Sequence, residues 1–171
     1  MTAPGRHYRY IGPADVKAAV RPGREGAGIR TPEDLAEWAA GRTSEELAEP
    51  FTFVIGADGI LRLSPRRSEH VACAGGDVVA SAGEIAFVRN AAEWVVDEVS
   101  NQSTGYCPDV TSWSAVAESL DQIGLRHPGA FTHEVVFRRC PVCQEHNIVR
   151  EAHFVCVYCD ADLPAEWNID T

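Results

Sequence analysis

A chain of 171 residues, 45% of them hydrophobic, is long enough to bury one substantial core, so the sequence predicts one main domain. No run approaches the roughly 20 apolar residues of a membrane-spanning helix, and the polar segment from Met1 to Tyr10 has no signal-peptide core. These features favour a soluble, cytoplasmic protein without a membrane partner. The formal charge of −10, concentrated in residues 51–171, argues against nucleic acid as a partner, because phosphate contacts need clustered Lys and Arg.

The first fifty residues predict short helices and a loop. Residues 1–12 are a polar tail or edge segment, and Pro13 opens a short helical stretch that ends at Val20. Residues 21–31 hold three glycines and a proline, which indicates a mobile loop. Two helices follow, over 33–40 and 43–48, each with a threonine at its start that can cap the first turn.

From Phe51 the pattern becomes that of strands. Runs 51–55 and 60–64 flank an Asp-Gly turn, which is a strong hairpin signal. Residues 84–89 and 93–100 form a second pair of β-rich runs with a short connection. Because short connections suit antiparallel neighbours, we expect an antiparallel meander.

A helical period returns over residues 111–123, with one apolar face and Gly124 at its end, so this helix is expected to cover the open face of the sheet. A last strand, 131–137, leads into the first cysteine pair. The predicted fold is therefore α+β: an antiparallel meander with N-terminal helices and one covering helix, forming a core domain over residues 1–137.

Four of the six cysteines form two Cys-x-x-Cys pairs, Cys140 with Cys143 and Cys156 with Cys159, separated by twelve residues. In a reducing compartment such pairs more often bind metal than form disulfides. Two thiolates on each tight turn can reach one tetrahedral metal at about 2.3 Å. Because four thiolates fill the coordination sphere, we expect one structural Zn²⁺ in a C-terminal unit over residues 138–171.

This arrangement resembles the zinc-ribbon family, whose iron-containing form is called rubredoxin-like, over roughly residues 138–164. The resemblance implies that the four cysteines are the ligands and that residues 148–150 and 153–155 form hairpin strands between them. Gln144 and Asp160 stand where such knuckles often place glycine, which is a departure from the pattern. The C-terminal unit is accordingly expected to be a zinc ribbon.

Polar side chains gather in two segments of the core domain, the loops 64–73 and 98–108. Loops on a rigid sheet are where sites are usually built, and if these two converge they would form a polar pocket. The candidate ligand-binding residues are Arg66, Arg67, Glu69, Asn101, Ser103 and Tyr106, and the candidate catalytic residues are His70 and Cys107.

Each of these residues also has a structural interpretation that the sequence leaves open. Cys73 and Cys107 can be buried small hydrophobes, since free cysteines are among the most buried residues. His70 can be a hydrogen-bonded structural histidine and Tyr106 an anchor for its loop. The two arginines can pair with surplus acid on a chain this negative.

A second resemblance covers part of the same region. Ala82-Gly83-Glu84, then a strand pair, then the segment from Asn101 to Pro108 is similar to bacterial toxin-type proteins in which an Ala-Gly-Glu hairpin precedes a Ser-Gly-His-Tyr loop. The histidine of that loop is missing here, so the resemblance implies no reaction.

Two functional hypotheses follow. The first is a zinc-stabilised, non-enzymatic binding module that recognises a small molecule or a partner peptide through loops 64–73 and 98–108. The second is a transferase or hydrolase with Cys107 as nucleophile and His70 as its base. That chemistry requires the sulfur of Cys107 and a ring nitrogen of His70 within about 4 Å of each other. A nucleic-acid-associated ribbon is a third interpretation, disfavoured by charge, and the sequence leaves the oligomeric state open.

Overall fold

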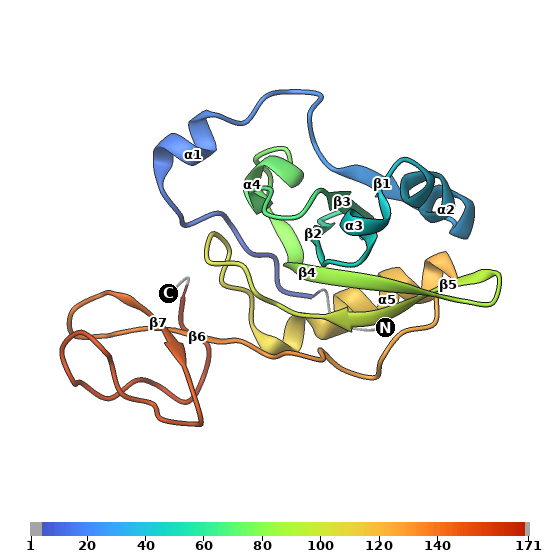
Figure 1. Cartoon of the computed structure of the whole chain (residues 1–171). Helices are drawn as coiled ribbons and strands as arrows, with labels where there is room; N and C mark the ends of the chain where they lie inside the picture. The colour runs from blue at the N-terminus through green and yellow to red at the C-terminus, as the bar shows by residue number, and fades with distance from the viewer. Residues whose placement is uncertain (1–4, 170–171) are drawn as a thin grey trace.

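A five-stranded antiparallel sheet forms the centre of the computed structural model, which describes residues 5–169 (Figure 1). Its strand order is β1-β3-β2-β4-β5. The strands are β1 (Ala27–Ile29), β2 (Phe51–Gly56), β3 (Leu61–Ser64), β4 (Val79–Asn90) and β5 (Glu93–Val99). The predicted α+β class is confirmed.

The helices of the described chain are short. They are α1 (Ala14–Ala18), α2 (Pro32–Ala40), α3 (Ser44–Leu47), α4 (His70–Cys73), the 3-10 helix η1 (Val110–Ser112) and α5 (Trp113–Ile123). Within residues 5–169 no helix combines the length and the apolar content needed to cross a membrane.

Local capping explains where the helices begin and end. The Thr31 hydroxyl accepts a hydrogen bond from the Asp34 backbone N–H at 3.1 Å, and the Asp34 carboxylate accepts one from the Thr31 N–H at 3.2 Å. Thr43 and Glu46 repeat this capping box at the start of α3. Helix α5 ends at Gly124, whose φ of 89° is the left-handed conformation that favours glycine. These boundaries confirm the predicted helices.

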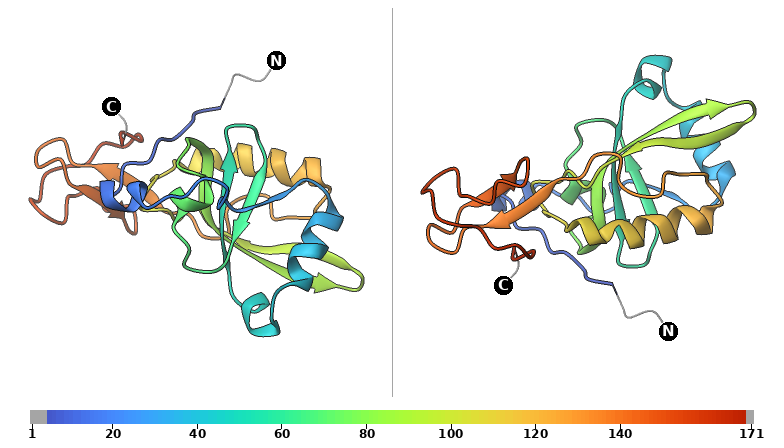
Figure 2. Two further views of the ribbon diagram at one scale, coloured as in Figure 1. Left: turned by 90° about the horizontal axis from the view of Figure 1, so that it is seen from above. Right: turned by 90° about the horizontal axis from the view of Figure 1, so that it is seen from below.

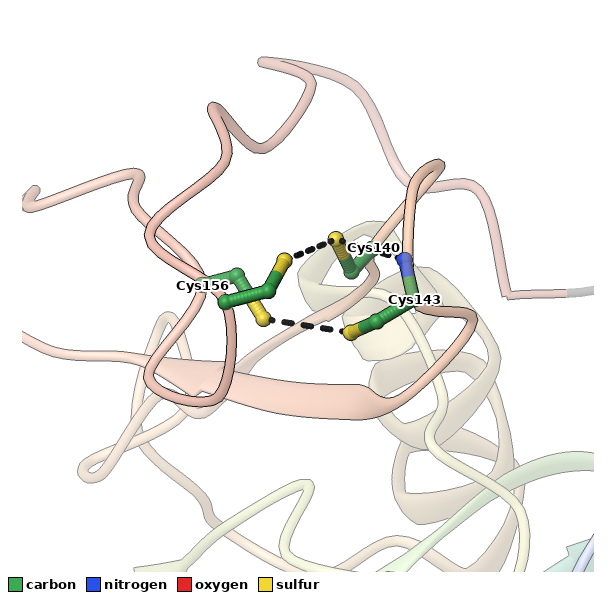
Figure 3. Close-up of side chains that lie close together, drawn as sticks. Cys140, Cys143 and Cys156 are labelled. Carbon is green, nitrogen blue, oxygen red and sulfur yellow. Dashed lines mark hydrogen bonds between the residues drawn. The ribbon is translucent and has the colours of Figure 1, made fainter.

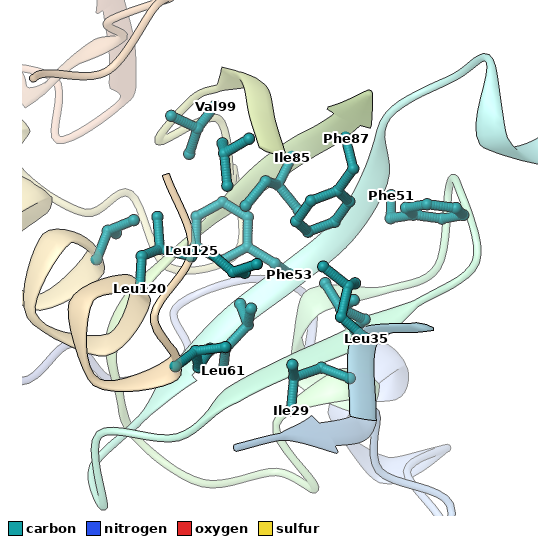
Figure 4. Packing of buried hydrophobic residues seen from close by; sticks show 14 of the residues in the cluster. Ile29, Leu35, Phe51, Phe53, Leu61, Ile85, Phe87, Val99, Leu120 and Leu125 are labelled. Carbon is teal, nitrogen blue, oxygen red and sulfur yellow. The ribbon is translucent and has the colours of Figure 1, made fainter. Parts of the chain in front are cut away.

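Helix α5 lies against one face of the sheet (Figure 2), as the sequence predicted. Its Val116 and Leu120 pack in the main hydrophobic cluster with Phe53 and Ile85 from the sheet, all fully buried (Figure 4). The opposite face, which includes Val54, carries a second cluster formed with α4 and the N-terminal segment. Strand β2 is thus buried on both faces, which explains its unbroken apolar run.

Part of the predicted tail, residues 5–12, is fastened to the sheet. Tyr8 is buried, its N–H donates to the Val79 carbonyl at 2.7 Å, and the Val79 N–H donates back to the Tyr8 carbonyl at 2.9 Å. The segment therefore makes one antiparallel bridge beside β4, in agreement with the edge segment that was the other interpretation of its sequence. Residues 1–4 lie outside the described residues.

Part of the predicted mobile loop 21–31 is a strand. Residues 27–29 pair with β3 as β1, and a side chain at Gly26 would come within 2.6 Å of the Cys73 sulfur and 2.9 Å of the Leu63 carbonyl oxygen. Gly26 therefore allows close packing of the chain rather than mobility.

The strand order departs from a simple meander. Strands β2 and β3 form one hairpin and β4 and β5 another, as predicted, but β4 pairs with β2 instead of β3. The connection from β3 to β4 contains α4, whose Val71 and Cys73 are buried. A connection of this length can cross β2, and burial of α4 against the sheet stabilises the crossing.

The C-terminal unit contains a second small sheet, in which β6 (Val136–Arg139) pairs antiparallel with β7 (His146–Val149). The strand expected at 131–137 thus lies further along the chain. The hairpin expected between 148–150 and 153–155 does not form, because β7 pairs with the strand before the first knuckle. Residues 151 and 152 both have positive φ, and 153–155 contribute one isolated bridge, from Val155 to Asp162.

A C-terminal strap, residues 164–169, returns from the ribbon to the sheet domain. The buried guanidinium of Arg138 on β6 donates to the carbonyls of Pro164 and Ala165 at 3.0 and 2.7 Å. The Trp167 indole N–H donates to the Cys107 carbonyl at 2.8 Å. The division into a core over 1–137 and a ribbon over 138–171 stays a prediction, and residues 170–171 lie outside the described chain.

Candidate metal centre

The sulfur atoms of the four predicted metal ligands form one cluster. The sulfurs of Cys140 and Cys159 are 3.6 Å apart, as are those of Cys143 and Cys156, and all four sulfurs lie within 4.8 Å of one another (Figure 3). A zinc ion with Zn–S bonds of about 2.3 Å at the centre of a tetrahedron requires sulfur separations of about 3.8 Å. A disulfide would need about 2.05 Å. The cluster fits a tetrahedral metal and excludes disulfide pairing in this geometry.

Backbone hydrogen bonds shape both cysteine turns in the same way. The Cys140 N–H donates to the Glu145 carbonyl at 2.9 Å, and the Gln144 N–H donates to the Cys140 carbonyl at 2.9 Å. The second knuckle repeats these bonds at equivalent positions, at 2.8 and 3.0 Å. These bonds close each turn around its two cysteines, and the pairing of β6 with β7 brings the first knuckle into position.

The residues that replace the expected glycines adopt the conformation that glycine would supply. Gln144 has φ of 67° and Asp160 has φ of 63°. The left-handed backbone conformation brings the Cβ of a non-glycine residue close to backbone atoms, and the resulting steric strain is smaller for Asp than for most others. The departure from the family pattern is therefore a local strain that leaves the knuckle geometry intact.

We expect Gln144→Gly to raise the free energy of unfolding of the zinc-loaded protein by up to about 1 kcal/mol. Relief of the left-handed strain, about 1–2 kcal/mol, outweighs the chain entropy of glycine, about 0.5–1 kcal/mol. Denaturant unfolding measures the change. Glu145→Gly, one position later and outside the positive-φ residues, is the control and should lower stability. A less stable Gln144→Gly variant would contradict this account.

N–H groups that point at the sulfur favour the thiolate of one cysteine in each knuckle, Cys140 and Cys156. The pKa values of Cys143 and Cys159, whose thiols hydrogen-bond to neighbouring cysteines, are raised. The Cys140 sulfur accepts from the N–H of Cys143 at 3.5 Å and of Val142 at 3.4 Å, and these donors lower the pKa of Cys140. Burial alone would raise the pKa of Cys156. The Tyr158 N–H and the Asn147 amide, each 3.4 Å from its sulfur, have the larger opposite effect and lower the pKa to about 6. Thiolates are the form that binds metal.

Asn147 is a functional residue that sequence reasoning missed. Its side chain is buried on β7, where the amide nitrogen donates to the Cys156 sulfur and to the Glu145 carbonyl, and the amide oxygen accepts from the Val157 N–H at 2.9 Å. One side chain thus joins both knuckles. Asn147 follows two other polar residues, Glu145 and His146, so no local pattern distinguished it.

Asn147→Ala should weaken zinc affinity by about 10- to 100-fold, the usual effect of removing a group that orients a metal ligand. Competition with a chromophoric chelator measures the affinity. His146→Ala, an exposed neighbour on the same strand, should leave it unchanged. Equal affinity in the wild-type chain and Asn147→Ala would show that the amide does not support the site.

The predicted ligand-binding residues of loop 98–108 are used inside the protein. Asn101 is fully buried, and its amide nitrogen donates to the carbonyls of Pro108 and Val135 at 3.0 and 2.8 Å. Its oxygen accepts from the Val135 N–H at 2.7 Å. Tyr106 is buried, its hydroxyl donates to the Asp77 carbonyl at 2.7 Å, and burial raises its pKa. These side chains hold the loop against the sheet and the strand that leads to the ribbon.

The charged residues of loop 64–73 lie at the surface. Arg66 forms an ion pair with Glu49, Arg67 has a positive φ of 65°, and Glu69 is exposed just before α4. Ser103, in the other loop, is buried instead. Five hollows of about 250 to 490 Å³ on the described chain are lined by none of the eight predicted ligand-binding and catalytic residues. Ligand binding by this set stays a prediction.

The two loops contribute to one buried cluster beside strand β4, which contains Val71 and Cys73 of the first loop and Tyr106 of the second. The His70 Nε2 donates to the Gly83 carbonyl at 2.8 Å, and a side chain at Gly83 would overlap the Ser100 carbonyl. This close approach explains the glycine of the Ala82-Gly83-Glu84 motif. Apolar packing and backbone contact, rather than a polar pocket, connect the two loops.

His70 and Cys107 have separate partners. Burial lowers the pKa of His70, whose Nε2 is engaged by the Gly83 carbonyl. The Cys107 thiol donates to the Thr104 carbonyl at 3.4 Å, and burial raises its pKa to about 12. A nucleophilic cysteine needs a lowered pKa and access to substrate, and Cys107 is only 2% exposed. The catalytic role stays a prediction that this geometry does not favour.

No family model, no curated protein and no solved structure matches this chain. The likeness to zinc ribbons therefore depends on the cysteine spacing and on the sulfur geometry.

Proposed function

We propose that the protein is a non-enzymatic binding module whose C-terminal ribbon is held by one structural Zn²⁺. The observation that carries the proposal is the closed set of four sulfurs within 4.8 Å. Four thiolates leave no open coordination position for a substrate or a water, and a soft, tetrahedral sulfur set suits zinc. The ion would supply folding energy to the ribbon rather than reaction chemistry.

The state of the remaining cysteines and polar groups supports the same function. All six cysteines of the described chain are free, and a reducing compartment such as the cytoplasm would keep the four ligands available for metal. The polar side chains of Asn101, Tyr106 and His70 form hydrogen bonds with backbone carbonyls. A module that works by presenting a rigid surface requires no reactive group.

Hydrogen exchange with and without a strong chelator tests the structural role of the metal. We expect chelation to remove the protection of both knuckles and to lower that of β6 and β7, while β2, β3 and β4 stay protected. The sheet and the knuckles have separate hydrophobic clusters, and a third cluster joins Phe137 of β6 to Cys107 of the sheet domain. Unchanged protection of the ribbon after complete metal removal would mean that the metal, if bound, is not structural.

A further inference from the structure

The most exposed large apolar side chains of the described residues gather at the two knuckles. Val142, Val157 and Tyr158 are 70%, 73% and 65% exposed, whereas Val78 and Val88, outside the ribbon, are 41% and 43% exposed. We call the first three the knuckle-tip patch. Clustered apolar exposure of this degree is typical of surfaces that are covered by a partner.

The residues of the knuckle-tip patch lie between the cysteines of the candidate metal site. Val142 lies between the first pair of cysteines, and Val157 and Tyr158 lie between the second pair. The four sulfurs hold these two turns beside one another. The backbone N–H groups of Val142 and Tyr158 each point at a cysteine sulfur, 3.4 Å away, which fixes the backbone and leaves the side chains in solvent. A preorganised apolar surface loses little entropy on binding.

The charge around the patch indicates what would cover it. Neither knuckle segment, 140–145 or 156–162, contains Lys or Arg, and both carry exposed acids: Glu145, Asp160 and Asp162. Arg139 directly precedes the first knuckle, so the acids outnumber the nearest cation by three to one. Four thiolates with one Zn²⁺ add a net charge of about −2. A second copy of this chain would bring the same acids and a charge of −10, and nucleic acid would bring phosphates, so both are repelled.

We propose that the knuckle-tip patch binds a basic protein segment, whose apolar side chains cover Val142, Val157 and Tyr158 and whose Lys or Arg side chains face the acids beside them. This inference rests on the proposed function, because the metal would hold the two knuckles, and with them the three side chains, beside one another. It differs from the loop 64–73 and 98–108 surface expected from the sequence and places recognition on the ribbon.

The test begins with a displayed library of random twelve-residue peptides, selected on the zinc-loaded full chain. We expect enriched peptides to combine Lys or Arg with apolar or aromatic residues. One enriched peptide is then synthesised, and its affinity is measured by fluorescence anisotropy at low and high salt. Binding should weaken with salt, because exposed charges are screened.

Two matched variants locate the binding surface. The variant Val142→Ser/Val157→Ser/Tyr158→Ser should lose at least about tenfold in affinity, as expected when central apolar contacts are removed. The variant Val78→Ser/Val88→Ser, which removes exposed apolar side chains outside the ribbon, should bind like the wild type. Neutralising the acids with Glu145→Gln/Asp160→Asn/Asp162→Asn should also weaken binding. Native mass spectrometry confirms one zinc in each variant, so that loss of binding is not loss of the ribbon.

The outcomes separate this inference from the proposed function. Equal binding by the knuckle-tip variant would overturn the inference while leaving a binding module in place elsewhere. No enrichment, or enrichment of acidic peptides, would also overturn it, as would a dimer that disappears in the knuckle-tip variant, since a second copy would then be the occupant. A wild-type chain that carries no zinc would refute the proposed function instead.

Discussion

Cys156→Ser should abolish metal binding and unfold the ribbon while the five-stranded sheet stays folded. The Cys156 sulfur belongs to the four-sulfur cluster and is the one that Asn147 and the Tyr158 N–H contact. In small zinc modules the binding free energy, about 10–16 kcal/mol, is also the folding free energy. The sheet has its own cluster around Phe53 and is expected to survive.

Metal content by native mass spectrometry and hydrogen exchange of the sheet and ribbon measure the two expected effects of Cys156→Ser. Cys73→Ser is the matched control, because Cys73 is buried beside the sheet and is not part of the sulfur cluster. We also expect Cys156→Ser to cause a modest loss of stability in the sheet domain, because Trp167 of the C-terminal strap packs edge to face on Tyr8 with ring centroids 5.3 Å apart. Collapse of the sheet together with the ribbon would show that the two parts are one cooperative unit.

Asn101→Ala is expected to destabilise the sheet domain by about 3–5 kcal/mol. It removes three buried hydrogen bonds and leaves the carbonyls of Pro108 and Val135 and the Val135 N–H without this partner. Each buried polar group left unsatisfied costs about 1–3 kcal/mol. Gln102→Ala, the exposed neighbour, should change stability by less than about 0.5 kcal/mol.

Denaturant unfolding of the two variants decides between a structural and a binding role for Asn101. A loss of less than about 1 kcal/mol in Asn101→Ala would contradict the structural role argued from the hydrogen bonds. If the stable variant also lost a ligand that the wild type binds, the pocket interpretation of loop 98–108 would replace it.

Features set by residues close together in the chain could be predicted. The capping boxes at Thr31 and Thr43, the Gly124 stop and the Asp58-Gly59 turn act within a few residues, so their physical causes are visible in the sequence. The metal ligands were predictable for the same reason. Each knuckle has a fixed internal spacing that is visible in the sequence, although the hairpin that forms, β6 with β7, encloses the first knuckle rather than joining the two.

Features that depend on contacts between distant segments could not be predicted. Strand β1 is recognisable only when Gly26 is placed against Cys73, and the place of β4 beside β2 depends on a connection from β3 that contains α4 and crosses β2. Asn101 looked like a ligand-binding residue because nothing local shows that its partner is Val135, 34 residues later. A polar side chain in a loop has the same sequence signature whether it binds a ligand or a distant backbone.

Native mass spectrometry of the full chain under reducing conditions tests the central claim most directly. The account predicts a mass increase that corresponds to one zinc ion per chain. This increase should be absent from the Cys140→Ser variant and from the Cys156→Ser variant, and present in Cys73→Ser. A reduced chain that stays free of metal when zinc is supplied would contradict it, and so would a zinc ion that both ligand variants retain.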